Sequence, residues 1–136
     1  MVAQEMNIVA DTNVLLRALV DDDAAQTSVA RAILDRADRI AIGNIALCEL
    51  AWVLSRAYRR SSEEIAAAIR GLVNAANIMM DRVAVEAGLA IADAGGDFAD
   101  GVIASEGRML GGETFVSFDR KAVRLLQNIG VAAQRL

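Results

Sequence analysis

Apolar residues recur along the chain in short blocks, and the spacing within the blocks switches between a strand pattern and a helix pattern. Short apolar or alternating runs predict strands, whereas apolar residues three and four positions apart predict helices. The predicted strands cover residues 7–10, 40–43, 78–80, 114–118 and 131–133. The predicted helices cover residues 14–20, 26–37, 44–58, 61–76, 83–94, 97–110 and 120–128.

Several of these helices begin at residues that favour helix N-termini. Ser61 and Glu64 have the spacing of a capping box, in which each residue satisfies a backbone N–H of the other. Asn44, Asp97 and Asp119 stand directly before apolar helical segments, where a short polar side chain can accept a hydrogen bond from the first turn. The sequence therefore predicts side-chain caps at four helix starts.

The alternation of strands and helices predicts an α/β fold. Strands joined through helices run parallel and form a sheet with helices on both faces. We expect a three-layer arrangement, with a short, mostly parallel central sheet flanked by helices. Because no proline-rich linker, internal repeat or low-complexity segment interrupts the 136 residues, we expect one domain spanning residues 1–136.

The residue composition excludes several classes of enzyme. The chain has no histidine and one cysteine, Cys48, which excludes Ser-His-Asp and Cys-His catalysis and leaves little basis for a zinc site. The longest uncharged stretches are ten residues, such as 71–80, whereas a membrane helix needs about 20 apolar residues. The N-terminus lacks the basic flank and cleavage site of a signal peptide. We expect a soluble, cytoplasmic protein that has no membrane association.

The charge balance neither requires nor excludes a nucleic-acid partner. The net charge is −4, whereas nucleic-acid binders usually present a basic surface. All the basic residues except Lys121 are arginine, which suits phosphate recognition, although biased codon usage explains the same composition. If several acidic residues share a cation site, the remaining surface is close to neutral.

Two aspartates directly follow predicted strands. Asp11 comes after the strand at 7–10, and Asp119 comes after the strand at 114–118. Ligands of open α/β sheets bind beyond the carboxyl ends of the strands. If the two strands are neighbours, the two carboxylates converge at one edge of the sheet. Aspartate is also a frequent helix N-cap, so a purely structural role stays open for each residue.

A glutamate interrupts an otherwise apolar helical segment. The residues predicted to share a helix face with Glu49 are Ile45, Cys48, Trp52 and Val53. Burial of a carboxylate among such residues is unfavourable unless it is paired or bound to a metal ion. An ion pair between Glu49 and Arg56, two helical turns further along, is the structural alternative.

Two more aspartates lie in the first turn of the predicted helix at 97–110. Asp97 suits the N-cap position, and the helix dipole favours a carboxylate at Asp100. Each acid therefore has a structural explanation, but together they form a set of oxygen ligands that suits Mg²⁺ or Mn²⁺. Two such ions about 4 Å apart can activate water and stabilise the leaving oxygen in phosphodiester cleavage without histidine.

Four segments resemble, in the same order, the motifs of PIN domains. They are residues 8–16, 46–54, 97–104 and 115–122. The resemblance places the acids of that family at Asp11, Glu49, Asp100 and Asp119, which would be both catalytic and metal-binding. It also implies supporting roles for Asp97, Thr12, Asn13 and Ser117. The departures are small, because Gly101 stands where alanine is usual and Ser117 where threonine is more typical.

In size the chain is similar to the VapC toxins of bacterial toxin–antitoxin pairs. That resemblance implies a Mg²⁺- or Mn²⁺-dependent endoribonuclease that cleaves structured RNA and is inhibited by a VapB-like antitoxin. The helices expected around 45–58 and 65–73 are unusually apolar, which favours a homodimer with an antitoxin groove beside the active site, although these residues could equally fill the core.

Two other functional classes remain open. One is a catalytically idle PIN-like module that binds a partner, for which the loss of an acid would be the sign. The other is a phosphoryl-transfer enzyme or receiver domain. The residues Asp11-Thr12-Asn13 lack the second carboxylate expected of haloacid-dehalogenase phosphatases, and Lys121 lies in a helix start rather than at a strand end.

Overall fold

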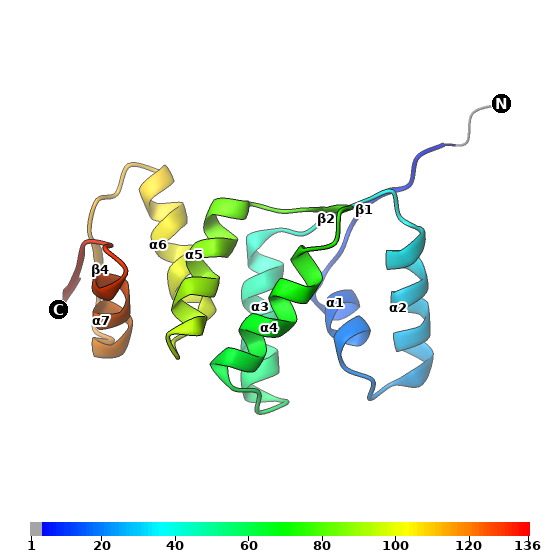
Figure 1. The fold of residues 1–136 in the computed structure, drawn as a ribbon, viewed down its shortest axis with the longest axis horizontal. Coiled ribbons are helices and arrows are strands. Elements are labelled where there is room, and N and C mark those ends of the chain that lie inside the picture. The colour runs from blue at the N-terminus through cyan, green and yellow to red at the C-terminus, as the bar shows by residue number, and fades with distance from the viewer. Residues whose placement is uncertain (1–3) are drawn as a thin grey trace.

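The computed structural model describes residues 4–136 and shows short strands alternating with helices (Figure 1). In chain order its elements are β1 (Asn7–Val9), α1 (Thr12–Leu19), α2 (Ala24–Arg36), β2 (Arg39–Ala41), α3 (Asn44–Arg56), α4 (Ser62–Val73), β3 (Ile78–Met79), α5 (Arg82–Asp93), α6 (Phe98–Met109), β4 (Phe115–Ser117), α7 (Arg120–Asn128) and β5 (Ala133–Arg135). Every predicted element is present, and β5 begins two residues later than expected. Within the described residues, no helix is long and apolar enough to cross a membrane.

The strands form two short parallel sheets. In the first, β2 lies between β1 and β3, with Ile8 opposite Ile40 and Ile40 opposite Ile78. In the second, β4 pairs with β5 and Phe115 lies opposite Ala133. The predicted α/β class with short parallel strands is confirmed. However, β1 and β4 belong to different sheets and lie toward opposite ends of the long axis in Figure 1.

Each sheet is associated with its own hydrophobic core. The larger core packs α1, α3, α4, α5 and α6 against the three-stranded sheet, and its fully buried side chains include Leu15, Ile40, Leu47, Leu50 and Ile69. The smaller core joins Ile91 of α5 and Ala104 of α6 to Leu125 and Leu126 of α7. Since α5 and α6 contribute to both cores, they connect the two halves of the structure.

Three of the four predicted caps are present. Ser61 and Glu64 form the complete capping box of α4. Asp97 and Asp119 accept hydrogen bonds from the first turns of α6 and α7. The cap predicted at Asn44 is wrong, because Gly43 occupies the N-cap position of α3. The side-chain amide of Asn44 instead donates to two carboxylates from other elements, Asp81 at 3.1 Å and Glu106 at 2.8 Å.

Helices α5 and α6 approach so closely that a side chain would not fit between them at one point. A Cβ atom added to Gly101 of α6 would lie 2.3 Å from the carbonyl oxygen of Ala87 in α5. One added to Gly88 of α5 would lie 2.6 Å from the ring of Phe98. Alanine, usual at position 101 in the PIN domains that the chain resembles, would require the two backbones to separate. Glycine at these positions therefore brings the first turn of α6 tightly against α5.

We expect Gly101→Ala to destabilise the protein by about 1–3 kcal/mol, the usual cost of overpacking a tight interior. Gly107→Ala in the same helix is the matched control, because nothing lies within 4 Å of an added Cβ atom there. Replacement of a helical glycine by alanine in open space is neutral or stabilising by up to about 1 kcal/mol. Urea denaturation of both variants measures the difference, and equal stabilities would contradict the close contact.

Candidate active site

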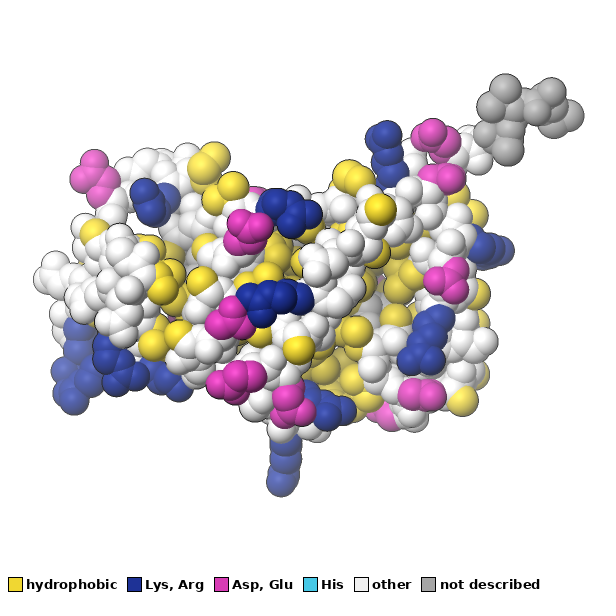
Figure 2. Space-filling view, viewed as in Figure 1, with side chains coloured by type: hydrophobic (Ala, Val, Ile, Leu, Met, Phe, Trp, Pro, Cys, Tyr) yellow, Lys and Arg dark blue, Asp and Glu magenta, His cyan; other side chains and the backbone are white. Residues whose placement is uncertain are grey.

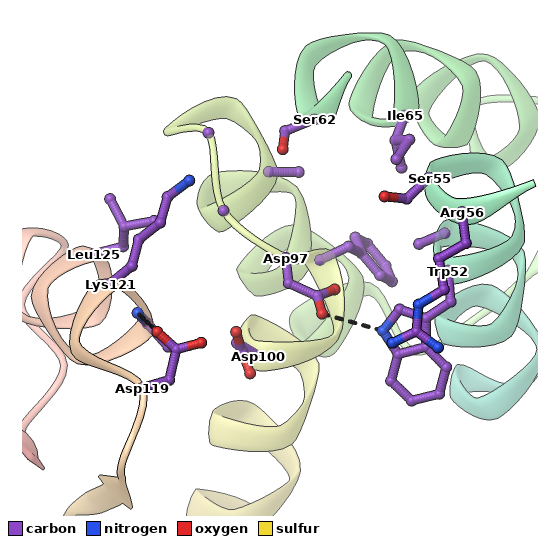
Figure 3. Close-up of a pocket in the computed structure, with 16 residues that line it drawn as sticks. Trp52, Ser55, Arg56, Ser62, Ile65, Asp97, Asp100, Asp119, Lys121 and Leu125 are labelled. Atoms are coloured by element: carbon purple, nitrogen blue, oxygen red, sulfur yellow. Dashed lines mark hydrogen bonds between the residues drawn. The ribbon is translucent and has the colours of Figure 1, made fainter. Parts of the chain in front are cut away.

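A cavity of about 320 Å³ lies where α3, α4, α6, α7 and the loop before α6 meet. Three carboxylates line it, from Asp97 and Asp100 at the start of α6 and from Asp119 at the start of α7 (Figure 3). Arg56 of α3 and Lys121 of α7 line the same cavity. The helix starts at 97 and 119, which are distant in the sequence, therefore present their acids to one open cavity, in which Asp97 and Asp119 are exposed and Asp100 is half-buried.

Two of these carboxylates are held in place by hydrogen bonds. One oxygen of Asp97 accepts from the backbone N–H of Ala99 at 3.0 Å, and the other accepts from the indole N–H of Trp52 at 3.1 Å. Asp119 accepts from the backbone N–H of Ala122 at 3.1 Å. The structural role expected of both residues is thus confirmed, and the same caps aim their carboxylates at the cavity.

Ser117 supports Asp119 from the end of β4. Its hydroxyl oxygen accepts a hydrogen bond from the backbone N–H of Asp119 at 3.0 Å. This bond fixes the turn between β4 and α7, so that Asp119 leaves the strand in a defined direction. A hydroxyl at position 117 is what this contact requires.

Asp100 lies between the other two acids and has no side-chain hydrogen bond to any residue of 4–136. Burial in the cavity wall, together with the negative charges of Asp97 and Asp119, raises the pKa of its carboxyl to about 6. In Figure 3 the Asp100 carboxylate points into the space between the other two. Among the described residues, no basic side chain forms an ion pair with these three acids, so the cavity concentrates negative charge.

Asp11 and Glu49 lie outside this cavity. Asp11 is exposed and caps α1 by accepting from the backbone N–H of Val14 at 3.1 Å. The predicted burial of Glu49 is wrong, since its side chain is exposed and its neighbour Ile45 is 76% exposed. The helix instead buries a stripe on its other side, formed by Leu47, Leu50, Ala51 and Leu54.

The two polar residues after Asp11 also lie away from the cavity. The hydroxyl of Thr12 donates to the backbone carbonyl of Ala46 at 3.4 Å, which ties α1 to α3. Asn13 lines a separate groove between α1 and α2. Within residues 4–136, no three acidic, cysteine or histidine side chains converge into a cluster that could enclose a metal ion. Asp97, Asp100 and Asp119 therefore line one cavity without forming a tight cluster, and Asp11 and Glu49 lie outside that cavity.

The separation follows from the sheet topology. Asp11 would approach Asp119 only if β1 and β4 were adjacent parallel strands, and each pairs with a different partner in this structure. The predicted ring of four carboxylates therefore depends on a strand pairing that the described conformation does not contain.

Two residues that line the cavity, Trp52 and Arg56, were not identified as candidate site residues from the sequence. Trp52 binds Asp97 through its indole N–H, and the Arg56 guanidinium lies 5.9 Å from the centre of the Trp52 ring. Arg56 therefore stacks on Trp52 instead of pairing with Glu49, which excludes the alternative ion pair in this structure. The four-residue spacing of Trp52 and Arg56 is typical of a side-chain contact on one helix face.

The Asp100 carboxyl provides a direct test of this charge crowding. In chelator, Asp119→Asn should lower the Asp100 pKa toward its ordinary value, because one of the two negative charges disappears. Titration of the Asp100 side-chain carbon by NMR measures it. Asp35→Asn, at an exposed position of α2, is the control and should leave the pKa of Asp100 unchanged.

The sign of the stability change follows from the same raised pKa. An acid whose pKa is higher in the folded state binds more protons when folded, so stability falls as the pH rises from the ordinary value of 3.8 to about 6. Asp100→Asn should remove this loss and be at least as stable as the parent at pH 7. If the variant were less stable than the parent, and by a larger margin at pH 7 than at pH 4, the raised pKa of Asp100 would be contradicted.

Comparison with known families agrees with the motifs along the chain. The PIN domain family matches residues 8–126, from within β1 to within α7. A comparison with curated proteins finds no match. The family match spans most of the chain, and it includes every acid considered above. The protein belongs to the PIN domain family, whose members are generally nucleases and usually use divalent metal ions.

Proposed function

We propose that the protein is a metal-dependent endoribonuclease and the toxin of a toxin–antitoxin pair. The observation that carries the proposal is the half-buried Asp100 carboxylate, which lies between two further acids in a cavity of a nuclease-type fold. Repulsion among three carboxylates destabilises the metal-free protein, and such crowding is retained where a cation relieves it.

The donor set fits a hard divalent cation. Mg²⁺ is commonly held by one or two carboxylates, with water filling its other positions, so a complete protein cage is not required. Asp100 and Asp119 would supply the ligands, while Asp97 is engaged by Trp52 and the α6 backbone. A bound Mg²⁺ or Mn²⁺ would lower the pKa of coordinated water and offset charge on the cleaved phosphate.

The surface beside the acids suits a nucleic-acid backbone. Arg120, Lys121 and Arg124 on α7 are exposed, and no ion pair within residues 4–136 involves them. Figure 2 shows basic side chains gathered over this end of the molecule, in the region where Figure 1 places α7. Although the net charge is −4, the surface next to Asp119 is therefore locally basic.

The basic residues of α7 and the residues that line the cavity would have different roles in binding and cleavage. The α7 side chains would hold consecutive phosphates outside the cavity, and Lys121 at its rim would draw one phosphate inward. Arg56, fixed by stacking on Trp52, would contact the same phosphate from the opposite wall. Asp97, bound by the Trp52 indole, would position this wall relative to Asp100.

The antitoxin part of the proposal is supported by a second, apolar groove. It lies between α1 and α2, measures about 340 Å³ and is lined by Val14, Val29, Ala30 and Ile33. Val29 lies at this groove and is 70% exposed, so a partner seated there would remove its side chain from water. A VapB-like antitoxin segment with an apolar helix face would fit this groove. Co-expression with any small reading frame found beside this gene, followed by co-purification with the parent and with the Val29→Asp protein, tests this assignment.

Activity assays separate this proposal from the two alternatives. A catalytically idle binding module would bind RNA or protein without cleaving, whatever the metal concentration. A phosphoryl-transfer enzyme would form an acyl-phosphate on an aspartate, which can be trapped, whereas a hydrolytic nuclease forms none.

Metal binding should be visible as a change in thermal stability. Millimolar Mg²⁺ or Mn²⁺ should raise the melting temperature, because a ligand that binds only the folded state stabilises it by mass action. The shift should disappear in Asp100→Asn and persist in Asp35→Asn. RNA cleavage by Asp100→Asn should fall on the order of a hundredfold or more, as for loss of one charge-stabilising group. Parental activity in this variant would refute the site.

RNA binding should depend on the basic face of α7. In Ca²⁺ or chelator, to prevent cleavage, Arg120→Ala with Arg124→Ala should weaken binding of single-stranded RNA. It should also reduce the slope of log affinity against log salt by about 0.7 for each lost phosphate contact. Arg36→Ala with Arg39→Ala removes two exposed arginines elsewhere and should have little effect. Equal salt slopes in the two pairs would contradict the proposed RNA path.

A further inference from the structure

The cavity that holds the three acids also has a neutral polar wall. Ser55 in the last turn of α3 and Ser62, the first residue of α4, line the cavity together with Arg56. Figure 3 shows both serine hydroxyls directed into the cavity, from the end that lies away from Asp100 and Asp119. One cavity therefore combines an acidic end with an end that carries hydroxyl groups.

Neither hydroxyl is used by the described part of the chain. Among residues 4–136, the serine hydroxyls that form hydrogen bonds are those of Ser61, which caps α4, and Ser117, which supports Asp119. Ser55 is exposed and Ser62 is half-buried, so a molecule in the cavity can reach both. A hydroxyl can donate one hydrogen bond and accept two. The two side chains therefore offer unused donors and acceptors to a ligand.

A structural role does not account for these two hydroxyls. Serine is favoured at helix N-caps, but the cap of α4 is Ser61, which forms the complete capping box with Glu64. Ser55 does not cap α3 either, because its C-cap is Ala57. Within a helix, serine is less favourable than alanine. Both serines are therefore available for binding.

The size and the apolar lining of the cavity suit one sugar–phosphate unit. Its volume of about 320 Å³ lies at the lower end of the range for small-molecule pockets, which is about 300–1,000 Å³. Phe98 is buried and the Arg56 guanidinium lies over the Trp52 ring, so the lining favours a sugar ring over a stacked base. The apolar residues that line the cavity are Ala51, Ile65, Ala92, Phe98, Ala122 and Leu125.

The charged residues of the lining place a phosphate next to the hydroxyls. Arg56 and Lys121 are the two basic residues of the cavity, and no ion pair within residues 4–136 involves either of them. Ser55 directly precedes Arg56 in α3. In RNA, the sugar on the 5′ side of each phosphate carries a 2′-hydroxyl beside the 3′-oxygen that bears that phosphate. A phosphate bound by Arg56 would therefore bring this 2′-hydroxyl toward the serine wall.

We propose that Ser55 and Ser62 bind the 2′-hydroxyl of the sugar on the 5′ side of the bound phosphate, so that the protein selects RNA over DNA. The 2′-hydroxyl donates and accepts hydrogen bonds and is the group by which a protein distinguishes RNA from DNA at a given position. The two serines determine specificity, because they contact the sugar and not the reacting phosphate. The inference rests on the proposed function for the identity of the ligand, but it concerns binding and requires no cleavage.

Binding of RNA and DNA oligonucleotides tests the sugar contact. Trp52 is the one tryptophan of the chain and lines the cavity, so its fluorescence reports occupancy there and not at the basic face of α7. With Ca²⁺ in place of Mg²⁺ to prevent cleavage, the parent should bind a hexamer more tightly as RNA than as DNA of the same sequence. Ser55→Ala with Ser62→Ala should reduce the ratio of RNA to DNA affinity about tenfold, as expected for the loss of one or two hydrogen bonds.

Single changes in the RNA locate the contact. Hexamers with one 2′-deoxy nucleotide at successive positions should bind the parent about tenfold more weakly at chiefly one position, and the double alanine variant should not show this loss. Ser55→Thr with Ser62→Thr keeps both hydroxyls and should retain the preference for RNA. Ser28→Ala, at an exposed position of α2, is the matched control and should keep the parental ratio of affinities.

The outcomes distinguish this inference from the proposed function. A parent that prefers RNA through the two serines, but cleaves no RNA with Mg²⁺ or Mn²⁺, would remove the proposed function and keep the sugar contact. RNA cleavage by a parent that binds RNA and DNA equally, or a parental affinity ratio in the double alanine variant, would overturn the sugar contact and keep the nuclease. Trp52 fluorescence that responds to neither oligonucleotide, or an equal loss of preference in Ser28→Ala, would also overturn the sugar contact.

Discussion

The contact between α5 and α6 sets the position of the two acids that α6 brings to the cavity, Asp97 and Asp100. Because Gly101 and Gly88 have no side chains, the two helices approach until backbone meets backbone. This contact spans both hydrophobic cores, since Ile91 and Ala104 belong to one and Leu89 and Val102 to the other. The first turn of α6 is thereby fixed between α3 and α7, with Asp97 facing Trp52 and Asp100 facing Asp119. A larger residue at position 101 would disturb the stability of the fold and the geometry of the cavity together.

The acids in the cavity combine structural and chemical roles. Asp97 and Asp119 satisfy backbone N–H groups at helix starts, which stabilises the fold whether or not a cation is bound. Asp100 has no such compensation and lies between their charges, so its raised pKa reflects an unfavourable interaction within the metal-free protein. The unfavourable free energy of this arrangement therefore falls mainly on Asp100. Cation binding at this residue would have the largest effect on stability.

The division into two sheets gives the protein an open form with matching edges at its two ends. A short strand such as β1 or β4 contributes little by itself, and its free backbone groups favour further pairing.

The sequence by itself determined the local structure. Apolar periodicity identified each helix and strand, and short-range hydrogen bonding identified the caps at Ser61, Asp97 and Asp119, because these features depend on residues three or four positions apart. The motifs also indicated the family and the acids at 97, 100 and 119 that share the cavity. Only the tertiary structure decided which face of α3 is buried, and hence that Glu49 is exposed, since an apolar helix offers more than one face to pack. It also decided that β1 and β4 lie in separate sheets, because strand pairing joins residues far apart in the sequence, such as Ile8 with Ile40 and Phe115 with Ala133, and leaves no periodic signal along the chain.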